Sequence, residues 1–387
     1  MRIGIDARSI LNPEKGDAIG VGHYTYQLIR HLLKNDTENE YVIFFDFRVR
    51  EKDVKKFTRP NVKIKFYPYS DYKKYLPGAY SEILGTATLQ KEKLDVLHTT
   101  SALNRIPLGY DGKMVVTFHD MSMYSIPKCL PAVKCLKNKT VAKLMARKAD
   151  KIIAVSESLR NDLKNLLDVY DNKMSVIYSG LDERFFEQPN VDAGKVLGKY
   201  GIMKKYILFL GTLEPSKNIP RLLEAFGKFK KQRQEKNSGK FEYQLVLAGK
   251  KGWRAGEYQK LVKDSGLSKD VIFTGYIVGD ELVPLFRKAE FFIMPSLYEG
   301  FGMTVLEAFA TETPAIVSKV SSLPEIAGEA AEYVDPENIE NIVKAMSFFT
   351  DESVRDRYRS LGLAQAKKFD WNKCAMETLA IYKSLSK

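Results

Sequence analysis

Short apolar runs alternate with helical patterns along the chain, and this alternation restarts near its middle. Strands that are buried on both faces of a parallel sheet are short, apolar and often β-branched, and each is joined to the next by a crossover helix. The fold class is therefore predicted as α/β, with two Rossmann-like parallel-sheet domains. The predicted strands are Arg2–Asp6, Tyr41–Phe47, Val62–Tyr67, Val96–His98, Met114–His119, Lys151–Ser156 and Met174–Tyr178, followed by Tyr206–Gly211, Tyr243–Gly249, Val271–Thr274, Glu290–Pro295 and Pro314–Ser318.

Two domains also follow from the length, because 387 residues exceed what one ordinary core holds. The interval 181–202 shows no strong strand pattern, so we predict an N-terminal domain over 1–185 and a C-terminal domain over 186–370. A last helix, at about 371–387, lies beyond the second series and is expected to cross back to the N-terminal domain. The other helices are predicted near 22–34, 77–92, 131–149, 156–166, 218–235, 255–265, 278–288, 303–311, 321–327, 337–350 and 352–368.

The composition is that of a globular protein, with 44% hydrophobic and 28% charged residues. No apolar run approaches the roughly 18–20 residues that span a bilayer. Asp6 interrupts the first apolar segment, which does not resemble a secretory signal. The three cysteines, Cys129, Cys135 and Cys374, have neither disulfide-framework nor zinc spacing. We therefore expect a cytoplasmic protein with reduced thiols.

The formal net charge is +13, and most of the excess lies in residues 128–151, which contain eight Lys or Arg residues and one acid, Asp150. Leu136, Val141, Leu144 and Met145 lie among the basic residues at helical spacing. This pattern has two interpretations, a basic amphipathic helix for an anionic membrane surface and a surface helix with a solvated lysine face. Nucleic acid is not an expected partner, because no recognition module accompanies the basic segment.

Ligands of open α/β sheets bind beyond the carboxyl ends of strands, so the candidate residues are those directly after predicted strands. In the first domain, Gly20 and Gly22 precede a helix and would let the backbone approach a phosphate at the helix N-terminus. His119, followed by Asp120, can act there by proton transfer or by hydrogen bonding. The structural alternatives are a glycine-rich helix entry and a histidine bonded to neighbouring backbone.

In the second domain, Lys217 follows a strand and is a counter-charge for phosphate, although a surface lysine is the alternative. The stretch SLYEGFGMTVLE carries Glu299 and Glu307 eight residues apart, with Gly300 and Gly302 between them. The glycines permit close backbone approach, and the two carboxylates are spaced to reach different parts of one hydroxyl-rich ligand. Taken singly, each glutamate has capping or surface charge as its alternative.

Together these residues resemble the retaining glycosyltransferases of family 4, which have the GT-B fold of two Rossmann-like domains facing a central cleft. The strongest match is the E-x7-E pair of Glu299 and Glu307. The segment GTLEPSKN with LYEGFG most resembles bacterial mannosyltransferases of surface polysaccharide and lipopolysaccharide synthesis. The matching segments are GVGHYT (20–25), HD (119–120), AVSES (154–158), GTLEPSKN (211–218), SLYEGFGMTVLEA (296–308), TPAIVS (313–318) and LPEIAG (323–328).

The resemblance implies that the C-terminal domain holds most of a nucleotide-diphosphate sugar. It implies that Glu299 accepts hydrogen bonds from sugar hydroxyls and Glu307 from ribose hydroxyls. The diphosphate-binding residues would be Lys217, with Gly20 and Gly22 from the other domain, and the backbone around Gly300, Phe301, Gly302, Met303 and Thr304.

The resemblance further implies that His119 contacts the transferred sugar near the reacting carbon, with Asp120 and Ser156 on the acceptor side. Positive charge and oriented N–H donors stabilise a departing diphosphate, so no metal or other cofactor is expected. The chain contains no Asp-x-Asp pair. Family members retain configuration without a settled protein nucleophile, and none is assigned here. One departure is Thr212, where many relatives carry arginine; Arg254 and Lys250 are candidates to compensate.

The sequence thus predicts a retaining, metal-independent glycosyltransferase that moves mannose from GDP-mannose to a hydroxyl of a growing, lipid-linked glycan. It would act in the cytoplasm, peripherally on the inner face of the cell membrane through residues 128–151. The alternatives are a UDP-sugar donor, a GT-B sugar-nucleotide epimerase, a phosphorylase-like enzyme, and a non-catalytic nucleotide-sugar binding protein.

Overall fold

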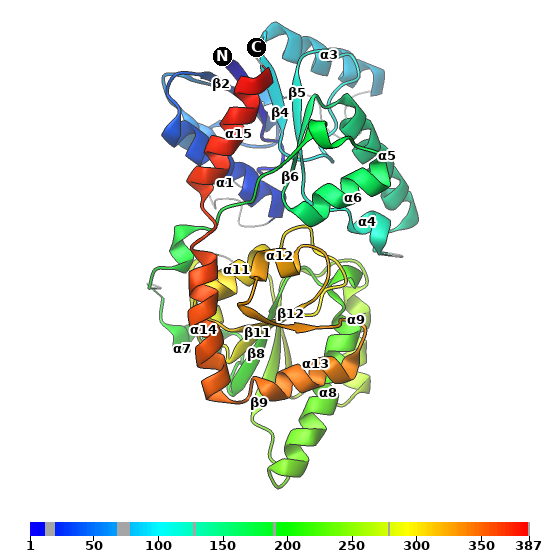
Figure 1. Ribbon diagram of the computed structural model, residues 1–387, viewed down its shortest axis with the longest axis vertical. Coiled ribbons are helices and arrows are strands. Elements are labelled where there is room, and N and C mark those ends of the chain that lie inside the picture. The colour runs from blue at the N-terminus through cyan, green and yellow to red at the C-terminus, as the bar shows by residue number, and fades with distance from the viewer. Residues whose placement is uncertain (12–19, 68–77, 127–128, 189–190, 278, 386–387) are drawn as a thin grey trace. The chain divides into compact units, whose positions relative to one another are not determined.

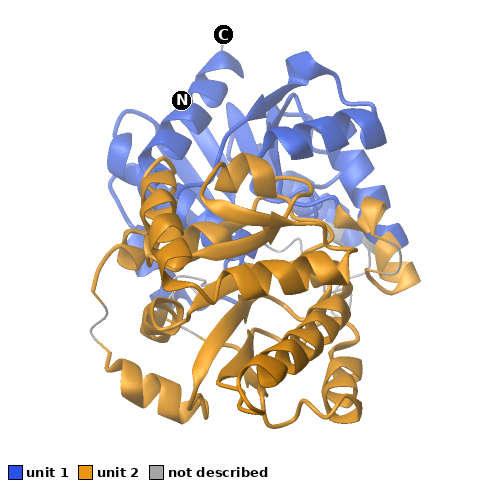
Figure 2. Cartoon of the chain, turned by 60° about the horizontal axis from the view of Figure 1, so that its bottom comes forward, with its two compact units in different colours: residues 1–121, 136–180, 370–387 blue, residues 122–135, 181–369 orange. Residues whose placement is uncertain are grey.

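The computed structural model describes residues 1–11, 20–67, 78–126, 129–188, 191–277 and 279–385. The chain forms two compact units, which Figure 2 draws in different colours. Unit 1 comprises Met1–Met121, Leu136–Gly180 and Asp370–Lys387, and unit 2 comprises Ser122–Cys135 and Leu181–Phe369.

Unit 1 is built on a seven-stranded parallel sheet with strand order β3-β2-β1-β4-β5-β6-β7. The order reverses between β1 and β4, which is where open α/β sheets bind ligands. The strands are β1 (Arg2–Asp6), β2 (Glu40–Asp46), β3 (Val62–Tyr67), β4 (Val96–Thr99), β5 (Met114–Phe118), β6 (Lys151–Ala154) and β7 (Met174–Val176). The main helices are α1 (Gly20–Asn35), α3 (Gly78–Lys91), α5 (Ala132–Lys148), α6 (Glu157–Leu167) and α15 (Trp371–Leu385).

All seven predicted strands of this half are present, but three were predicted too long. The predicted ends at His119, Ser156 and Tyr178 lie one or two residues beyond the observed strands. The last pair that joins β5 to β6 is Phe118 with Ala154, so pairing stops before His119 and Ser156. His119 and Ser156 therefore belong to the loops at the carboxyl edge of the sheet.

Helix α15 packs beside α1 within unit 1 (Figure 1). Its first residue, Trp371, is 2% exposed and lies against Gly180. A Cβ atom at Gly180 would lie 2.1 Å from the backbone nitrogen of Trp371, so only glycine permits this approach. The last helix is thereby anchored to the first sheet through backbone contact as well as side-chain burial.

Unit 2 is built on a six-stranded parallel sheet with strand order β10-β9-β8-β11-β12-β13, which reverses between β8 and β11. The strands are β8 (Lys205–Leu210), β9 (Tyr243–Ala248), β10 (Val271–Gly275), β11 (Phe291–Met294), β12 (Ala315–Ser318) and β13 (Ala331–Val334). The helices of four or more residues are α4 (Ser122–Ser125), α7 (Ala193–Lys199), α8 (Ile219–Lys236), α9 (Ala255–Asp264), α10 (Leu282–Arg287), α11 (Met303–Ala310), α12 (Leu323–Ala327), α13 (Ile339–Phe348) and α14 (Glu352–Ala366).

Three elements of unit 2 were not predicted: the four-residue helix α4, the strand β13 and the helix α7. The strand is a half-buried edge strand, so its sequence, AEYV, lacks a continuous apolar run. The helix AGKVLGK contains two glycines and buries only Val196, which leaves no helical periodicity to detect. Strand β13 and helix α7 are both short elements, and α7 packs against helix α10.

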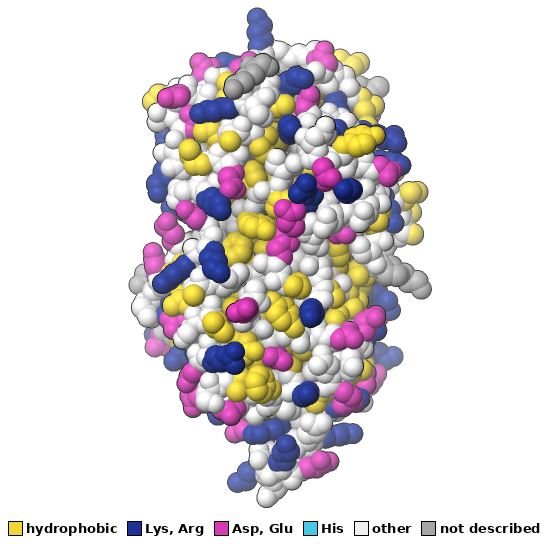
Figure 3. Space-filling view, viewed as in Figure 1, with side chains coloured by type: hydrophobic (Ala, Val, Ile, Leu, Met, Phe, Trp, Pro, Cys, Tyr) yellow, Lys and Arg dark blue, Asp and Glu magenta, His cyan; other side chains and the backbone are white. Residues whose placement is uncertain are grey.

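Helix α5 confirms a helix in the basic segment, but its apolar residues do not form one buried face. Met145 is buried, whereas Leu136 is 69% exposed and Val133 is 85% exposed. On the face that Figure 3 draws, basic and acidic side chains are interspersed, so the excess positive charge forms no single-sign surface there. Among the described residues, no helix is both long and apolar enough to cross a membrane.

Candidate functional site

In unit 2, the loop after β8 and the loop after β11 meet at the point where the strand order reverses. Asn218 joins them, because its side-chain amide donates to the carbonyl oxygens of Pro295 at 3.0 Å and Pro336 at 2.7 Å. Asn218 adopts the left-handed conformation, with φ of 58°. Leu297 N donates to Ser216 O at 2.8 Å, which adds a backbone link. Two loops distant in sequence are thereby held in one arrangement.

Lys217 and Glu299 form the charged centre of this arrangement. Lys217 Nζ lies 2.6 Å from Glu299 Oε1, and Ser296 Oγ donates to the same oxygen at 2.8 Å. The Glu299 residue is 8% exposed, and its own backbone N–H donates to Ser321 Oγ at 2.8 Å. A buried carboxylate is stable only when paired, and here the lysine and serine supply the pairing.

Helix α11 begins directly beyond Glu299 with an uncapped N-terminus. Gly302 precedes it with φ of 104°, a conformation that disfavours any side chain, whereas Gly300 does not adopt a positive φ. No side chain among the described residues caps the helix, so the N–H groups at Met303 and Thr304 point outward from the first turn. Phe301 is buried and packs edge-on against Phe369. A helix start of this kind is electrostatically favourable for an anion.

Ser322 fixes the backbone that leads into this helix. Its hydroxyl lies 2.9 Å from the carbonyl oxygens of both Glu299 and Phe301. Ser296, Ser321 and Ser322 were not predicted as site residues. Ser296 lies in the family-like segment at 296–308, whereas Ser321 and Ser322 lie between the segments at 313–318 and 323–328. Their role is to hold Glu299 and the helix entry in place.

Glu307 has surroundings opposite to those of Glu299. It lies in the second turn of α11, is half-buried, and accepts no side-chain or backbone hydrogen bond from any described residue. Burial raises the pKa of its carboxyl to about 8, although the charge of Arg184 lowers it in part. Of the two carboxyls of the E-x7-E pair, that of Glu299 is therefore paired with a lysine, whereas that of Glu307 holds a proton at neutral pH. Arg184 was not predicted from the sequence.

In unit 1, His119 lies directly after β5, and its hydrogen bonding selects one tautomer of the imidazole. Its Nε2 atom is 2.7 Å from Thr100 O, and a carbonyl oxygen only accepts, so Nε2 carries the hydrogen. Burial lowers the pKa of the imidazole to about 4, which leaves it neutral at pH 7. No described residue bonds to Nδ1, which is therefore a hydrogen-bond acceptor. Asp120 beside it is exposed.

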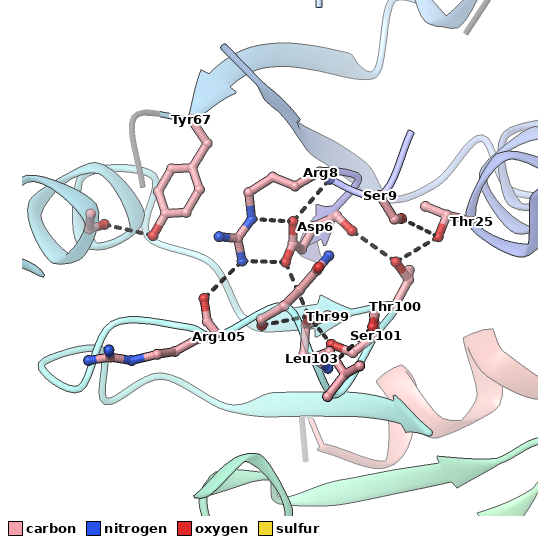
Figure 4. Close-up of polar contacts among 12 residues, drawn as sticks. Asp6, Arg8, Ser9, Thr25, Tyr67, Thr99, Thr100, Ser101, Leu103 and Arg105 are labelled. Atoms are coloured by element: carbon pink, nitrogen blue, oxygen red, sulfur yellow. Dashed lines mark hydrogen bonds and ion pairs between the residues drawn. The ribbon is translucent and has the colours of Figure 1, made fainter. Parts of the chain in front are cut away.

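A polar cluster that was not predicted lies at the carboxyl ends of β1 and β4 (Figure 4). Asp6 accepts from Arg8 Nε at 2.8 Å and Nη2 at 2.7 Å, and from Thr99 Oγ1 at 3.1 Å. Thr100 Oγ1 donates to Asp6 O at 3.0 Å, which fixes the residue whose carbonyl orients His119. Because these hydroxyls and the carboxylate already satisfy one another, the cluster orders the sheet edge rather than offering open ligands.

The remaining predicted residues of unit 1 lie at helix starts. Gly20 opens α1 with φ of 53° and has no described atom within 4 Å of where a Cβ atom would lie, whereas Gly22 is buried inside the first turn. Ser156 is fully buried, and its hydroxyl caps α6 by accepting from Leu159 N at 3.1 Å. The hydroxyl thus has a structural role in capping α6, and its acceptor-side role stays a prediction. No group of three potential metal-ligating side chains occurs among the described residues.

Comparisons with known proteins place this arrangement in a family. A model described as Glycosyl transferases group 1 matches residues 198–365, and one described as Glycosyltransferase Family 4 matches residues 19–185. The chain is 30% identical to O-antigen chain mannosyltransferase B of Escherichia coli over 277 residues, which are 70% of this chain and 71% of that protein.

Solved structures show the same fold. Sucrose-phosphate synthase from Thermosynechococcus elongatus aligns with a TM-score of 0.75 at 18% identity, covering 100% of this chain and 99% of that one. Alr3699/HepE from Anabaena, in complex with UDP and glucose, aligns with a TM-score of 0.73 at 15% identity, covering 99% and 100%. The predicted GT-B fold is confirmed, and the chain belongs to the retaining glycosyltransferases of family 4.

Proposed function

We propose that this chain transfers mannose from GDP-mannose to a hydroxyl group of a growing, lipid-linked glycan. The observation that carries the donor part is the Lys217–Glu299 pair beside the uncapped N-terminus of α11. A nucleotide-diphosphate sugar offers an anion and vicinal hydroxyls side by side, and this arrangement complements both. The choice of mannose rests on the 30% identity to the Escherichia coli mannosyltransferase.

The roles of the unit 2 residues follow from their charges. Lys217 and the N–H groups at Met303 and Thr304 stabilise the negative charge that develops on the diphosphate as the glycosidic bond to it breaks. Glu299 accepts hydrogen bonds from the sugar hydroxyls and keeps Lys217 in place through their 2.6 Å contact. Glu307 accepts from the ribose hydroxyls.

The roles in unit 1 concern the transferred sugar. His119 Nδ1 accepts a hydrogen bond from a sugar hydroxyl near the reacting carbon, because its Nε2–H is already donated to Thr100 O. The backbone at Gly20 approaches the diphosphate. The acceptor oxygen bonds to the anomeric carbon on the face that the diphosphate leaves, and its proton passes to the departing phosphate oxygen. Configuration is retained without a protein nucleophile.

Thermal unfolding with nucleotide diphosphates and nucleotide sugars, without added metal, tests the donor. GDP and GDP-mannose at about 100 times their dissociation constants are expected to add roughly 2.7 kcal/mol to the free energy of unfolding. Selective stabilisation by UDP or a UDP-sugar would contradict GDP-mannose as the donor. Conversion of the donor without acceptor would identify an epimerase, and binding without turnover for any glycan would identify a binding protein. Lys217→Ala is the control, and it should abolish the stabilisation.

The lipid-linked acceptor is supported by helix α5. Its first two turns expose Val133 and Leu136, at 85% and 69%, beside the exposed basic residues Lys134 and Lys137. Exposed apolar side chains flanked by lysines suit an anionic bilayer surface, where the apolar groups enter the headgroup region and the lysines pair with lipid phosphates. We propose that this helix places the protein on the inner face of the cell membrane.

Vesicle sedimentation checks this placement. The protein is expected to sediment with phosphatidylglycerol vesicles at low salt and to remain unbound with phosphatidylcholine vesicles or at high salt, because salt screens the lysines. The double variant Val133→Ser/Leu136→Ser should lose most of the binding. The control is Met376→Ser, which changes a half-exposed apolar side chain on a different helix, α15. This variant should bind as the wild type does. Equal behaviour of both variants would contradict a role for α5.

A further inference from the structure

A chain of hydrogen bonds crosses the interior of unit 1 from the last helix toward His119. Tyr382 on α15 places its hydroxyl 2.5 Å from His98 Nδ1, and His98 Nε2 lies 2.8 Å from Thr117 Oγ1. Thr117 Oγ1 in turn lies 3.4 Å from the hydroxyl of Tyr24 on α1. All four side chains are buried, with at most 3% exposure. The proposed function uses none of them.

Each link of this chain depends on the next. Burial lowers the pKa of His98 to about 3, so its ring is neutral, with one nitrogen donating and the other accepting. Both nitrogens have partners, and so does the Thr117 hydroxyl that joins His98 to Tyr24. Removal of one hydroxyl leaves a buried nitrogen without its partner, which strains the arrangement on both sides of the break.

The chain ends at the residue that packs on His119. The Tyr24 ring meets the His119 ring edge-on, with centroids 4.6 Å apart and planes at 76°. The Tyr24 ring also packs edge-on against Trp371 of α15, with ring centroids 5.7 Å apart. Such edge-on contacts fix the relative orientation of two rings. The position of Tyr24 therefore determines which orientations the imidazole can take.

Helix α1 also holds His119 by a second route, which runs from Thr25 on α1 through Thr100 in the loop after β4. Thr25 Oγ1 donates to Thr100 Oγ1 at 2.8 Å, and Thr100 O accepts from His119 Nε2 (Figure 4 shows the two threonines). Two consecutive residues of α1 thus fix the imidazole. Tyr24 does so by a direct ring contact, and Thr25 does so by holding Thr100, whose carbonyl oxygen accepts from the imidazole. Helix α15 holds α1 at this point through Trp371 and through the chain that starts at Tyr382.

We infer that Tyr382 is a positioning residue: acting through His98, Thr117 and Tyr24, it fixes the His119 ring so that Nδ1 faces the transferred sugar. The inference rests on the proposed function for the role of His119. A neutral, fully paired hydrogen-bond chain in the buried interior of unit 1 specifies one arrangement of two helices against a sheet, and catalysis requires such precision at the reacting centre. The last helix then contributes to turnover as well as to folding.

The test is Tyr382→Phe, which removes the hydroxyl and keeps the ring. We expect kcat to fall by about tenfold while KM for the donor stays within about twofold, because a misplaced catalytic contact affects the transition state more than binding. Nitrogen-15 spectra of the four histidine rings should show the His119 signals shifted. Thr117→Val, which breaks the chain at another link, should produce the same two changes.

The matched control is Tyr41→Phe. Tyr41 is a buried tyrosine of unit 1 whose hydroxyl donates to Asp36 Oδ2 at 2.5 Å. Its variant should lose stability with unchanged kcat and unchanged His119 signals. Equal kcat and identical His119 spectra in Tyr382→Phe and the wild type would overturn the inference, whatever the loss of stability. If the wild type turns over no nucleotide sugar, the proposed function fails, and the His119 spectrum still decides whether Tyr382 positions the ring.

Discussion

Glu299→Gln is expected to lower turnover by about 10²–10³ without weakening the binding of GDP. The amide cannot neutralise Lys217 and loses the charge-assisted hydrogen bonds to the sugar hydroxyls. The free nucleotide does not use these bonds. Lys217, no longer shared with a carboxylate at 2.6 Å, has its full charge available to the diphosphate. The affinity for GDP should therefore stay constant or rise, while kcat with GDP-mannose falls.

The control for this variant is Glu290→Gln. Glu290 pairs with Arg355 at 3.0 Å in the same unit, with both side chains largely buried, but it lies outside the loops that carry Lys217 and Glu299. Breaking that pair leaves a buried arginine uncompensated, so the variant should lose thermal stability and keep its turnover. Turnover in Glu299→Gln within about threefold of the wild type would refute the role of Glu299 at the sugar.

Most of the strands were predictable because they are short runs buried on both faces, which leaves a local signal, although β3 and β10 are only partly buried. Strand β13 and helix α7 gave no such signal, since neighbouring elements supply most of what stabilises them. Strand ends were predicted too long at His119 and Ser156, because pairing with β6 and helix capping decide where those strands stop. Local sequence carries neither interaction.

Residue types at the candidate site were predictable, but their pairings were not. The carboxylates and glycines after β11 follow a recognisable spacing, whereas the bond between Lys217 and Glu299 joins residues 82 positions apart. That bond depends on the left-handed backbone at Asn218 and on its contacts with two other loops. The tautomer of His119 depends similarly on a carbonyl of another strand's loop. The pairing of Lys217 with Glu299 and the tautomer of His119 therefore depend on the three-dimensional arrangement of the loops and could not be predicted from the sequence.

The affinity for GDP is expected to rise about tenfold between pH 7 and pH 9, because Glu307 must ionise before it accepts hydrogen bonds from both ribose hydroxyls. Its pKa is raised to about 8 by burial, so at neutral pH most molecules hold a proton that binding must release. Calorimetry in buffers of different ionisation enthalpies should show that proton release directly. Glu307→Gln should bind GDP more weakly and with no pH dependence in this range. An affinity that falls with pH would mean that the protonated carboxyl is the binding form.

The same raised pKa predicts the effect of Glu307 on stability. Between the ordinary carboxyl pKa, about 4.3, and the folded value of about 8, the folded state holds a proton that the unfolded state has lost. Stability therefore falls as the pH rises through this window, and the contribution is restored below it. Glu307→Gln removes the dependence, so its unfolding temperature should exceed that of the wild type clearly at pH 8 and only slightly at pH 5. We expect the Glu307 carboxyl to lower the stability of the fold at working pH and yet to be required for nucleotide affinity. This combination is expected of a ligand-binding residue and not of a structural one.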